Sequence, residues 1–181
     1  MKEILNELTE HRALSQSTAR QVLMDLASGK YNASQMTAFM TVYMMRAITV
    51  QELQGFRDAM LELCIPMTFD APVIDVCGTG GDGKNTFNIS TLSAFVVAAA
   101  GQPVAKHGNY GVSSVSGSSN VLEFFGYKFT NDKDVLQRSL ERANILFMHA
   151  PLFHPAMKNV APIRKELGVK TFFNMLGPMV N

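Results

Sequence analysis

Apolar residues in the first part of the chain recur at helical spacing. The clearest stripe spans residues 36–44 and follows an i, i+3, i+4, i+7, i+8 pattern. Further stripes lie within residues 5–8, 19–26 and 53–63. The pattern predicts four short helices over residues 1–64. Their apolar faces are expected to pack against one another and against either the rest of the chain or a second copy.

Two polar pairs have the spacing of a capping box, in which each side chain caps a backbone N–H group of the other residue. These are Thr18 with Gln21 and Thr49 with Glu52. Both pairs stand where an apolar stripe begins, so they predict the starts of the second and fourth helices.

The period of the apolar pattern changes after a proline-bounded link at residues 66–72. Strands are predicted at residues 73–77, 103–106, 145–148 and 169–173, and helices at residues 91–100, 121–125, 132–143 and 155–167. Alternating strands and helices favour an α/β layer with mostly parallel strands. We therefore expect an α/β fold with an N-terminal all-helical subdomain: a helical, dimer-forming domain over residues 1–66 and an α/β domain over residues 71–181.

Composition narrows the class of protein. Of the 181 residues, 47% are hydrophobic and 17% charged, with a net charge of +1, which favours a globular protein with neither nucleic acid nor a membrane as partner. The N-terminus does not resemble a signal peptide. Cys64 and Cys77 are isolated, so their spacing predicts neither a disulfide framework nor a zinc site. A cytoplasmic location is expected.

A glycine-rich segment between a predicted strand and a predicted helix carries the strongest chemical signal. Residues 78–83 hold four glycines and follow the strand at residues 73–77. Such a loop lets backbone N–H groups approach an anion at the positive end of a helix dipole. The segment therefore predicts a phosphate or pyrophosphate site.

Other interpretations of this loop fit less well. Gly78, Gly80 and Gly83 match the dinucleotide fingerprint, but the second strand ends in Lys106 and His107 and not in an acidic residue. A P-loop would need Ser or Thr where Asn85 stands. A bare turn between strand and helix needs only one or two glycines, because each additional one costs conformational entropy.

Seven segments together resemble the anthranilate phosphoribosyltransferase family. They are residues 78–83 (Gly-Thr-Gly-Gly-Asp-Gly), 86–91 (Thr-Phe-Asn-Ile-Ser-Thr), 104–109 (Val-Ala-Lys-His-Gly-Asn), 113–118 (Ser-Ser-Val-Ser-Gly-Ser), 154–158 (His-Pro-Ala-Met-Lys), 160–168 (Val-Ala-Pro-Ile-Arg-Lys-Glu-Leu-Gly) and 173–178 (Phe-Asn-Met-Leu-Gly-Pro). The resemblance covers the whole chain. The ordered set is specific, although the glycine loop alone is not.

The resemblance implies a fold of the nucleoside phosphorylase and phosphoribosyltransferase type, working as a homodimer through its helical domain. The implied reaction transfers phosphoribose from phosphoribosyl pyrophosphate to the amine of anthranilate, with magnesium as cofactor, in tryptophan biosynthesis. The implied phosphoribosyl pyrophosphate positions are Gly78, Gly81, Asp82, Thr86, Asn88, Ile89, Ser90, Thr91, Lys106, Ser114 and Ser118. The implied anthranilate positions are Gly78, His107, Asn109, His154 and Arg164. Ser90 is the implied magnesium ligand.

The residue types suit this chemistry. Departure of pyrophosphate needs its charge neutralised and requires no covalent nucleophile, so Lys106 is the expected catalytic residue. Arg164 can fork onto a carboxylate. The alternatives are a solvated lysine at a strand end, a surface arginine, structural roles for His107 and His154, and a turn-forming role for Asp82.

Two departures from the family pattern stand out. Tyr110 and Gly111 follow the His-Gly-Asn segment where the family usually has Arg-Ser, which removes one cation. The chain also stops where family members continue for about as many residues again, including an Asp-Glu pair that binds magnesium. We therefore expect a fold incomplete at its C-terminus and little or no turnover by this chain alone. A pyrimidine nucleoside phosphorylase and a non-catalytic helical dimerisation module are the alternative functions.

Overall fold

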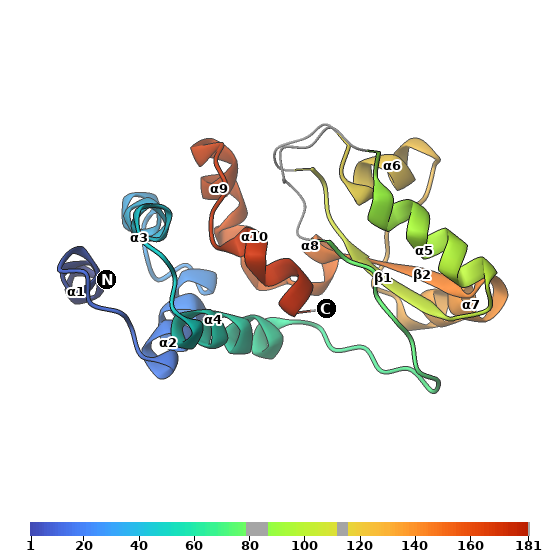
Figure 1. The fold of residues 1–181 in the computed structure, drawn as a ribbon, viewed down its shortest axis with the longest axis horizontal. Coiled ribbons are helices and arrows are strands. Elements are labelled where there is room, and N and C mark those ends of the chain that lie inside the picture. Colours follow the sequence, from blue (N-terminus) through green and yellow to red (C-terminus); the bar gives the residue numbers. More distant parts are fainter. Residues whose placement is uncertain (79–86, 112–115, 181) are drawn as a thin grey trace. The chain divides into compact units, whose positions relative to one another are not determined.

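The computed structural model describes residues 1–78, 87–111 and 116–180, which form two compact units (Figure 1). The helical unit consists of Met1–Cys64 together with His154–Val180. The α/β unit consists of Ile65–Phe153.

Helices make up the helical unit, and all four helices expected in its N-terminal part form. Their bounds are α1 Lys2–Thr9, α2 Gln16–Ala27, α3 Ala33–Met45 and α4 Val50–Leu63. The later segment adds the 3-10 helix η1 Pro155–Asn159, α9 Ala161–Leu167, α10 Phe173–Leu176 and the 3-10 helix η2 Gly177–Met179.

Side-chain caps define where the helices of this unit begin. The capping box predicted at Thr49 and Glu52 is present at the start of α4. The box predicted at Thr18 is wrong, because α2 begins three residues earlier, where the Ser15 hydroxyl accepts a hydrogen bond from the Thr18 N–H at 3.1 Å. A third box, Asn32 with Gln35, starts α3.

An aromatic cluster joins the two segments of the helical unit. The Phe172 ring stacks on Phe56 at 4.5 Å between centroids and meets Phe39 edge-on at 6.0 Å. All three side chains are at most 2% exposed. Burying a large aromatic side chain contributes about 1.5–3 kcal/mol, so residues 154–180 are an integral part of this core.

The α/β unit is built around two parallel strands (Figure 1). Its elements are α5 Ile89–Ala99, β1 Val104–Gly108, α6 Ser118–Phe124, α7 Lys133–Ala143, β2 Ile145–His149 and α8 Ala150–Phe153. The register runs from Val104 opposite Ile145 to Gly108 opposite His149. The expected mixture of helices and parallel strands is confirmed for these elements.

The two faces of β1 are covered by different helices. Val104 packs with Ala94 and Ala98 of α5, whereas Ala105 packs with Leu136 and Leu140 of α7. Since successive side chains of a strand point to opposite faces, Lys106 shares the face of Val104. By the same alternation, His107 shares the face of Ala105.

The strand predicted at residues 73–77 is reduced to a single parallel bridge between Ile74 and Val104. The Ile74 N–H donates to the Pro103 carbonyl at 3.1 Å, and the Ala105 N–H donates to the Ile74 carbonyl at 3.0 Å. Pro72 lacks an N–H on one side, and the glycine loop begins at Gly78 on the other. The segment still runs parallel to β1 as expected.

The strand predicted at residues 169–173 is wrong. Gly168, with a φ of 64°, ends α9 in the left-handed conformation. The Asn174 side chain then accepts a hydrogen bond from the Thr171 N–H at 3.1 Å, and α10 begins at Phe173. The apolar run that suggested a strand is buried in the helical unit, where a turn followed by a helix buries the same side chains.

The helix predicted at residues 155–167 is divided into η1 and α9, with Pro162 in the first turn of α9. By their contacts, residues 154–180 group with the N-terminal helices. The domain bounds of residues 71–181 stay a prediction.

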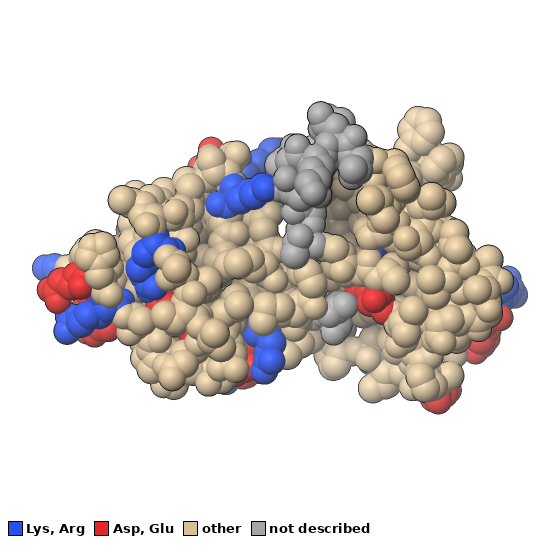
Figure 2. All heavy atoms as spheres, in the orientation of Figure 1, with Lys and Arg blue, Asp and Glu red and all other residues tan. Residues whose placement is uncertain are grey.

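Charges of both signs are interspersed on the face drawn in Figure 2, in line with the net charge of +1. Arg12 pairs with Glu10, and Lys30 with Asp25, at 2.8 and 2.7 Å. Among the described residues, no helix combines the length and the apolar character needed to cross a bilayer.

Candidate functional site

The candidate site of the α/β unit lies at the carboxyl ends of its parallel segments. Helix α5 lies in the chain between the segment at Ile74 and β1. These two extended segments run parallel to each other. The connecting helix must therefore run back against them, which places its N-terminus at the edge where β1 ends. Ligands of open α/β sheets bind at this edge.

Lys106 is the buried cation of this edge. The residue is only 2% exposed, and its ammonium donates to the His107 carbonyl at 3.4 Å. Burial lowers the pKa of Lys106, while the nearby charges of Asp75 and Cys77 raise it. Charges interact more strongly away from water, so this ammonium is suited to hold an anion.

Asn88 organises the N-terminus of α5. Its carboxamide oxygen accepts a hydrogen bond from the Thr91 N–H at 3.3 Å, and its amide donates to the Ser116 carbonyl at 3.2 Å. The second bond ties the start of α5 to the loop that follows β1. Ile89 and Ser90 form the first turn, and the buried Thr91 hydroxyl has no hydrogen-bond partner among the described residues.

The loop after β1 folds back closely on itself. A Cβ atom on Gly108 would lie 2.2 Å from the Ser118 hydroxyl, and one on Gly117 would lie 2.1 Å from the Gly111 nitrogen. The Asn109 carbonyl accepts hydrogen bonds from the Ser119 N–H at 3.1 Å and the Ser118 hydroxyl at 3.4 Å. Only glycine permits these approaches, which hold Ser118 and Asn109 together.

Asn120 is a residue of this loop that the sequence analysis did not single out. Its side-chain oxygen accepts hydrogen bonds from the N–H groups of Gly111 and Gly117, at 2.9 and 3.1 Å. The only indication in the sequence is that Asn120 follows Gly117 by three residues at the start of a helix. This spacing is too common to predict that the Asn120 side chain holds the loop in place.

Tyr110, which stands where the family usually has arginine, contacts Glu123 and His149. Its hydroxyl donates to the Glu123 carboxylate at 3.1 Å, and its ring meets the His149 ring edge-on at 5.1 Å. The Ser119 hydroxyl lies 2.9 Å from Nδ1 of the same imidazole.

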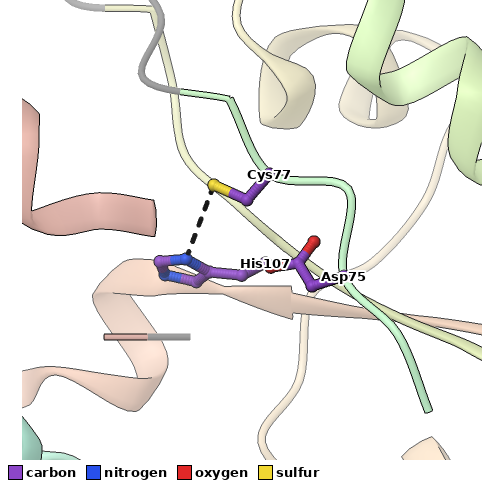
Figure 3. Close-up of side chains that lie close together, drawn as sticks. All are labelled: Asp75, Cys77 and His107. Carbon is purple, nitrogen blue, oxygen red and sulfur yellow. Dashed lines mark hydrogen bonds between the residues drawn. The ribbon is translucent and has the colours of Figure 1, made fainter. Parts of the chain in front are cut away.

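His107 lies beside two other polar side chains of the α/β unit (Figure 3). Its Nδ1 is 4.0 Å from the Cys77 sulfur, and Asp75 is close by. Burial lowers the pKa of His107 and the Lys106 charge lowers it too, while Asp75 raises it. The net effect favours the neutral imidazole at pH 7.

Arg164 and His154, two of the expected anthranilate contacts, belong to the helical unit. The Arg164 guanidinium donates to the Asn174 side chain at 3.4 Å and lies over the Phe173 ring at 5.1 Å from its centroid. Burial lowers the pKa of Arg164. His154 is 7% exposed, and its carbonyl accepts a hydrogen bond from the Met157 N–H at 3.0 Å.

The α/β unit thus contains most of the expected site residues that the structure describes. They are Gly78, Asn88, Ile89, Ser90, Thr91, Lys106, His107, Asn109 and Ser118. Gly78 is exposed, and no atom of the described residues lies within 4 Å of the place where its Cβ atom would stand. Four expected residues lie outside the described part of the chain: Gly81, Asp82, Thr86 and Ser114.

Comparison with known families accounts for both parts of the chain. Residues 70–181 match the model described as "Glycosyl transferase family, a/b domain", and residues 2–64 match "Glycosyl transferase family, helical bundle domain". The chain belongs to this glycosyl transferase family. The expected fold class, an α/β fold with an N-terminal helical part, is confirmed.

Within the glycosyl transferase family, the chain is similar to anthranilate phosphoribosyltransferases, as its motifs indicated. It is 63% identical to the enzyme of Christiangramia forsetii over 100% of this chain and 55% of that protein. The crystal structure of the Thermus thermophilus enzyme superposes on this chain with a TM-score of 0.86 and a sequence identity of 36%. The match covers 98% of this chain and 54% of that one.

A further family structure was determined with ligands. The Saccharomyces cerevisiae enzyme, in complex with phosphoribosyl pyrophosphate and magnesium, is 28% identical with a TM-score of 0.83, covering 97% of this chain and 53% of that one. The present chain spans about half the length of the relatives it matches.

Proposed function

We propose that this chain carries substrate-binding elements of an anthranilate phosphoribosyltransferase, which transfers phosphoribose from phosphoribosyl pyrophosphate to anthranilate in tryptophan biosynthesis. The observation that carries the proposal is the buried Lys106 at the carboxyl end of β1, in a chain 63% identical to such an enzyme. A buried ammonium beside the N-terminus of α5 is suited to a diphosphate.

The reaction breaks the bond between C1 of the ribose and pyrophosphate and forms a bond from C1 to the anthranilate nitrogen, which loses a proton. Positive charge develops on the sugar and negative charge on the leaving group. Lys106 and the N–H groups at the start of α5 would neutralise the leaving group. Asn88 and Ser118 would position the loops around the substrate.

Magnesium is the proposed cofactor, supported by its presence with the substrate in the yeast structure. The residues at the start of α5 fit it in kind, because a hydroxyl oxygen is the hard ligand that magnesium prefers, and Ser90 offers one there. When bound, magnesium would neutralise charge on the substrate's phosphates. Gly81, Asp82, Thr86 and Ser114 remain proposed contacts of the same substrate.

For anthranilate we propose contacts from His107, Asn109, His154 and Arg164, together with the backbone at Gly78. Arg164 would bind the carboxylate, because a guanidinium can donate two parallel hydrogen bonds to it. Its present contacts with Asn174 and Phe173 would orient the guanidinium for this role.

A lysine pair tests the proposal directly. Lys106→Met removes the buried ammonium, and Lys128→Met removes an exposed one in the same unit. Calorimetric titration with phosphoribosyl pyrophosphate and magnesium should show binding to the wild-type chain, unchanged in Lys128→Met. Loss of a charge-assisted hydrogen bond of about 1.5–3 kcal/mol should weaken binding by Lys106→Met about 10- to 100-fold. Equal binding by both variants would contradict the role of Lys106.

Two activity assays complement the titration. Loss of anthranilate fluorescence follows the proposed reaction, and we expect little or no turnover from the 181-residue chain alone, because it spans about half of its relatives. Arsenolysis of thymidine or uridine follows the nucleoside phosphorylase alternative. Nucleoside cleavage without phosphoribosyl pyrophosphate binding would favour that alternative.

A homodimer through the helical part is also proposed, in the cytoplasm. Met45 and Val50, at the α3–α4 connection, are 84% and 71% exposed, which suits a surface covered by a partner. The free thiols Cys64 and Cys77 suit a reducing compartment. Light scattering should give twice the chain mass of 19.9 kDa. Met45→Glu should shift the protein to the monomer.

A further inference from the structure

Three side chains with different metal-binding chemistries meet on one face of the α/β unit. Asp75, Cys77 and His107 each offer a ligand atom, and these atoms all lie within 4.8 Å of one another (Figure 3). The Cys77 sulfur and His107 Nδ1 are 4.0 Å apart. Among the described residues this is a compact group of potential metal ligands, separate from Ser90, the residue proposed to bind magnesium.

The parallel register of the sheet explains why these residues meet. The bridge pairs Ile74 with Val104. Continued by three residues, the same register places Cys77 beside His107 on the adjacent segment. Alternation puts Asp75 and Cys77 on one face of their extended segment. Their common face is that of Val73 and Ala105, which pack together in the core under α7.

The distances between ligand atoms are near those of a tetrahedral zinc site. Zinc bonds of about 2.0–2.3 Å to nitrogen, oxygen and sulfur separate neighbouring ligand atoms by about 3.3–3.6 Å. A contraction of at most about 1.2–1.5 Å would bring the three atoms from within 4.8 Å to these separations. The backbone hydrogen bonds of Ile74 with Pro103 and Ala105 hold the start of this segment to β1.

The ligand types discriminate between metals. Thiolate and imidazole favour zinc and copper, whereas magnesium takes oxygen ligands. The cluster therefore suits a different metal from the one proposed for catalysis.

We propose that Asp75, Cys77 and His107 bind a thiophilic divalent cation such as Zn²⁺, with a fourth position open to water or a ligand. On binding, the Cys77 thiol loses its proton to solvent and the sulfur forms the bond to the metal. His107 binds through its neutral imidazole, which its buried surroundings favour. No redox change is involved.

Occupation of this site has a consequence that rests on the proposed function. His107 would be held by the metal and no longer be available to anthranilate, and a second cation would stand near Lys106. Zn²⁺ should therefore inhibit any activity of the protein. Binding of the metal does not depend on this consequence.

Cobalt(II) is the spectroscopic probe for the site, because a cobalt–thiolate bond gives an intense near-ultraviolet charge-transfer band. The 181-residue chain should develop this band with one equivalent of Co²⁺ and lose it on addition of Zn²⁺. One proton per metal should be released, measured with a pH indicator in weak buffer.

The two cysteines provide the matched controls. Cys64 lies at the end of α4, where its thiol donates to the Leu61 carbonyl at 3.0 Å, in the helical unit. Cys64→Ser should keep the band and the Zn²⁺ affinity. Cys77→Ser should lose the band and bind Zn²⁺ at least about tenfold more weakly, since loss of even an outer partner typically costs 10- to 100-fold.

His107→Gln and Asp75→Asn provide independent variants, each checked for folding by circular dichroism. Both should weaken Zn²⁺ binding while the cobalt–thiolate band is diminished or shifted. A band that persists unchanged in Cys77→Ser would overturn the proposal. So would a folded His107→Gln variant with wild-type affinity, or the absence of any band in the wild-type chain.

Discussion

Glu52 is a buried carboxylate at the centre of the helical unit. It is 0% exposed and accepts hydrogen bonds from the Leu14 N–H, the Tyr43 hydroxyl and the Thr49 N–H at 2.9–3.0 Å, and it pairs with Arg46. Burial alone would raise the pKa of Glu52, but these hydrogen bonds and the Arg46 charge outweigh it and lower the pKa to about 2. The carboxylate thus joins the starts of α2 and α4 to the end of α3.

Glu52→Gln should lower the free energy of unfolding by about 3 kcal/mol, because breaking a buried ion pair leaves Arg46 uncompensated. Glu62→Gln, on the exposed end of the same helix, removes a surface pair with Arg20 and should cost less than about 1 kcal/mol. Urea unfolding followed by circular dichroism measures both. Equal losses would contradict the buried network.

The same carboxylate makes stability depend on pH. Its folded pKa, about 2, is below the ordinary value of 4.5, so its contribution is complete above pH 4.5. It is lost as the pH falls towards 2. Wild-type stability should decline over this window more steeply than that of Glu52→Gln.

Under the proposed function, the pKa of Lys106 would set an alkaline limit to substrate binding. Its pKa lies below the ordinary lysine value of 10.5, mainly through burial, with Asp75 and Cys77 opposing that shift. Under the proposed function, affinity for phosphoribosyl pyrophosphate should therefore fall at a lower pH than an ordinary lysine would give. Lys106→Arg should move this fall to higher pH. Titrations at a series of alkaline pH values test this, and an unchanged pH dependence in the arginine variant would contradict it.

Helices α2 and α4 pack closely because of one glycine. A Cβ atom on Gly55 would lie 2.3 Å from the Gln16 carbonyl oxygen and 2.9 Å from the Arg20 nitrogen. Both are backbone atoms, which cannot move aside as a side chain can. The glycine is needed for close approach of the two helices.

Gly55→Ala should destabilise the helical unit by about 1–3 kcal/mol through overpacking. The sign of this change is informative. Without a steric clash, replacing glycine by alanine within a helix would stabilise it by about 1 kcal/mol. Gln51→Ala, on the exposed first turn of α4, is the control and should be neutral or slightly stabilising. Thermal unfolding distinguishes the two, and a stabilised Gly55→Ala would refute the close contact.

At the scale of elements, helices were easier to predict from sequence than strands. The stripe around Phe39 predicted α3, because helical period and burial agree there. The run at residues 169–173 has the residues of a strand, but Phe172 and Phe173 are buried among helices, which only tertiary contacts decide. Ser15 caps α2 in place of the predicted Thr18. Both residues have a hydroxyl that can cap a helix, so the local sequence does not distinguish them.

The candidate site was predictable only in part for a similar reason. Motifs pointed to Lys106, yet its burial follows from packing around β1 that no local pattern encodes. Cys77 is isolated in sequence, so cysteine spacing could not indicate its approach to His107. That approach depends on the register between two parallel segments, 30 residues apart along the chain.

At the scale of the molecule, the helical unit is discontinuous in sequence. Its core combines residues 1–64 with Val160, Phe172 and Leu176 of the later segment. Asn159 adds a hydrogen bond from its side chain to the Ala27 carbonyl at 2.7 Å.

Residues 1–66 expressed alone should therefore fold poorly, with Phe39 and Phe56 exposed where Phe172 normally covers them. We expect strong binding of a hydrophobic dye and weak unfolding cooperativity relative to the 181-residue chain. Fluorescence and calorimetry measure these properties. A cooperative, dye-free dimer of residues 1–66 would instead support the helical dimerisation module as an independent function.

This discontinuity bears on the order in which the protein is made. Residues 65–153 leave the ribosome before Phe172 does. The α/β unit can therefore fold while the N-terminal helices still lack their contacts with residues 154–180. Nascent chains paused between these points would display unpaired aromatic rings, which chaperones recognise. Slow codons after residue 153 should therefore lower the soluble yield, whereas slow codons before residue 64 should not.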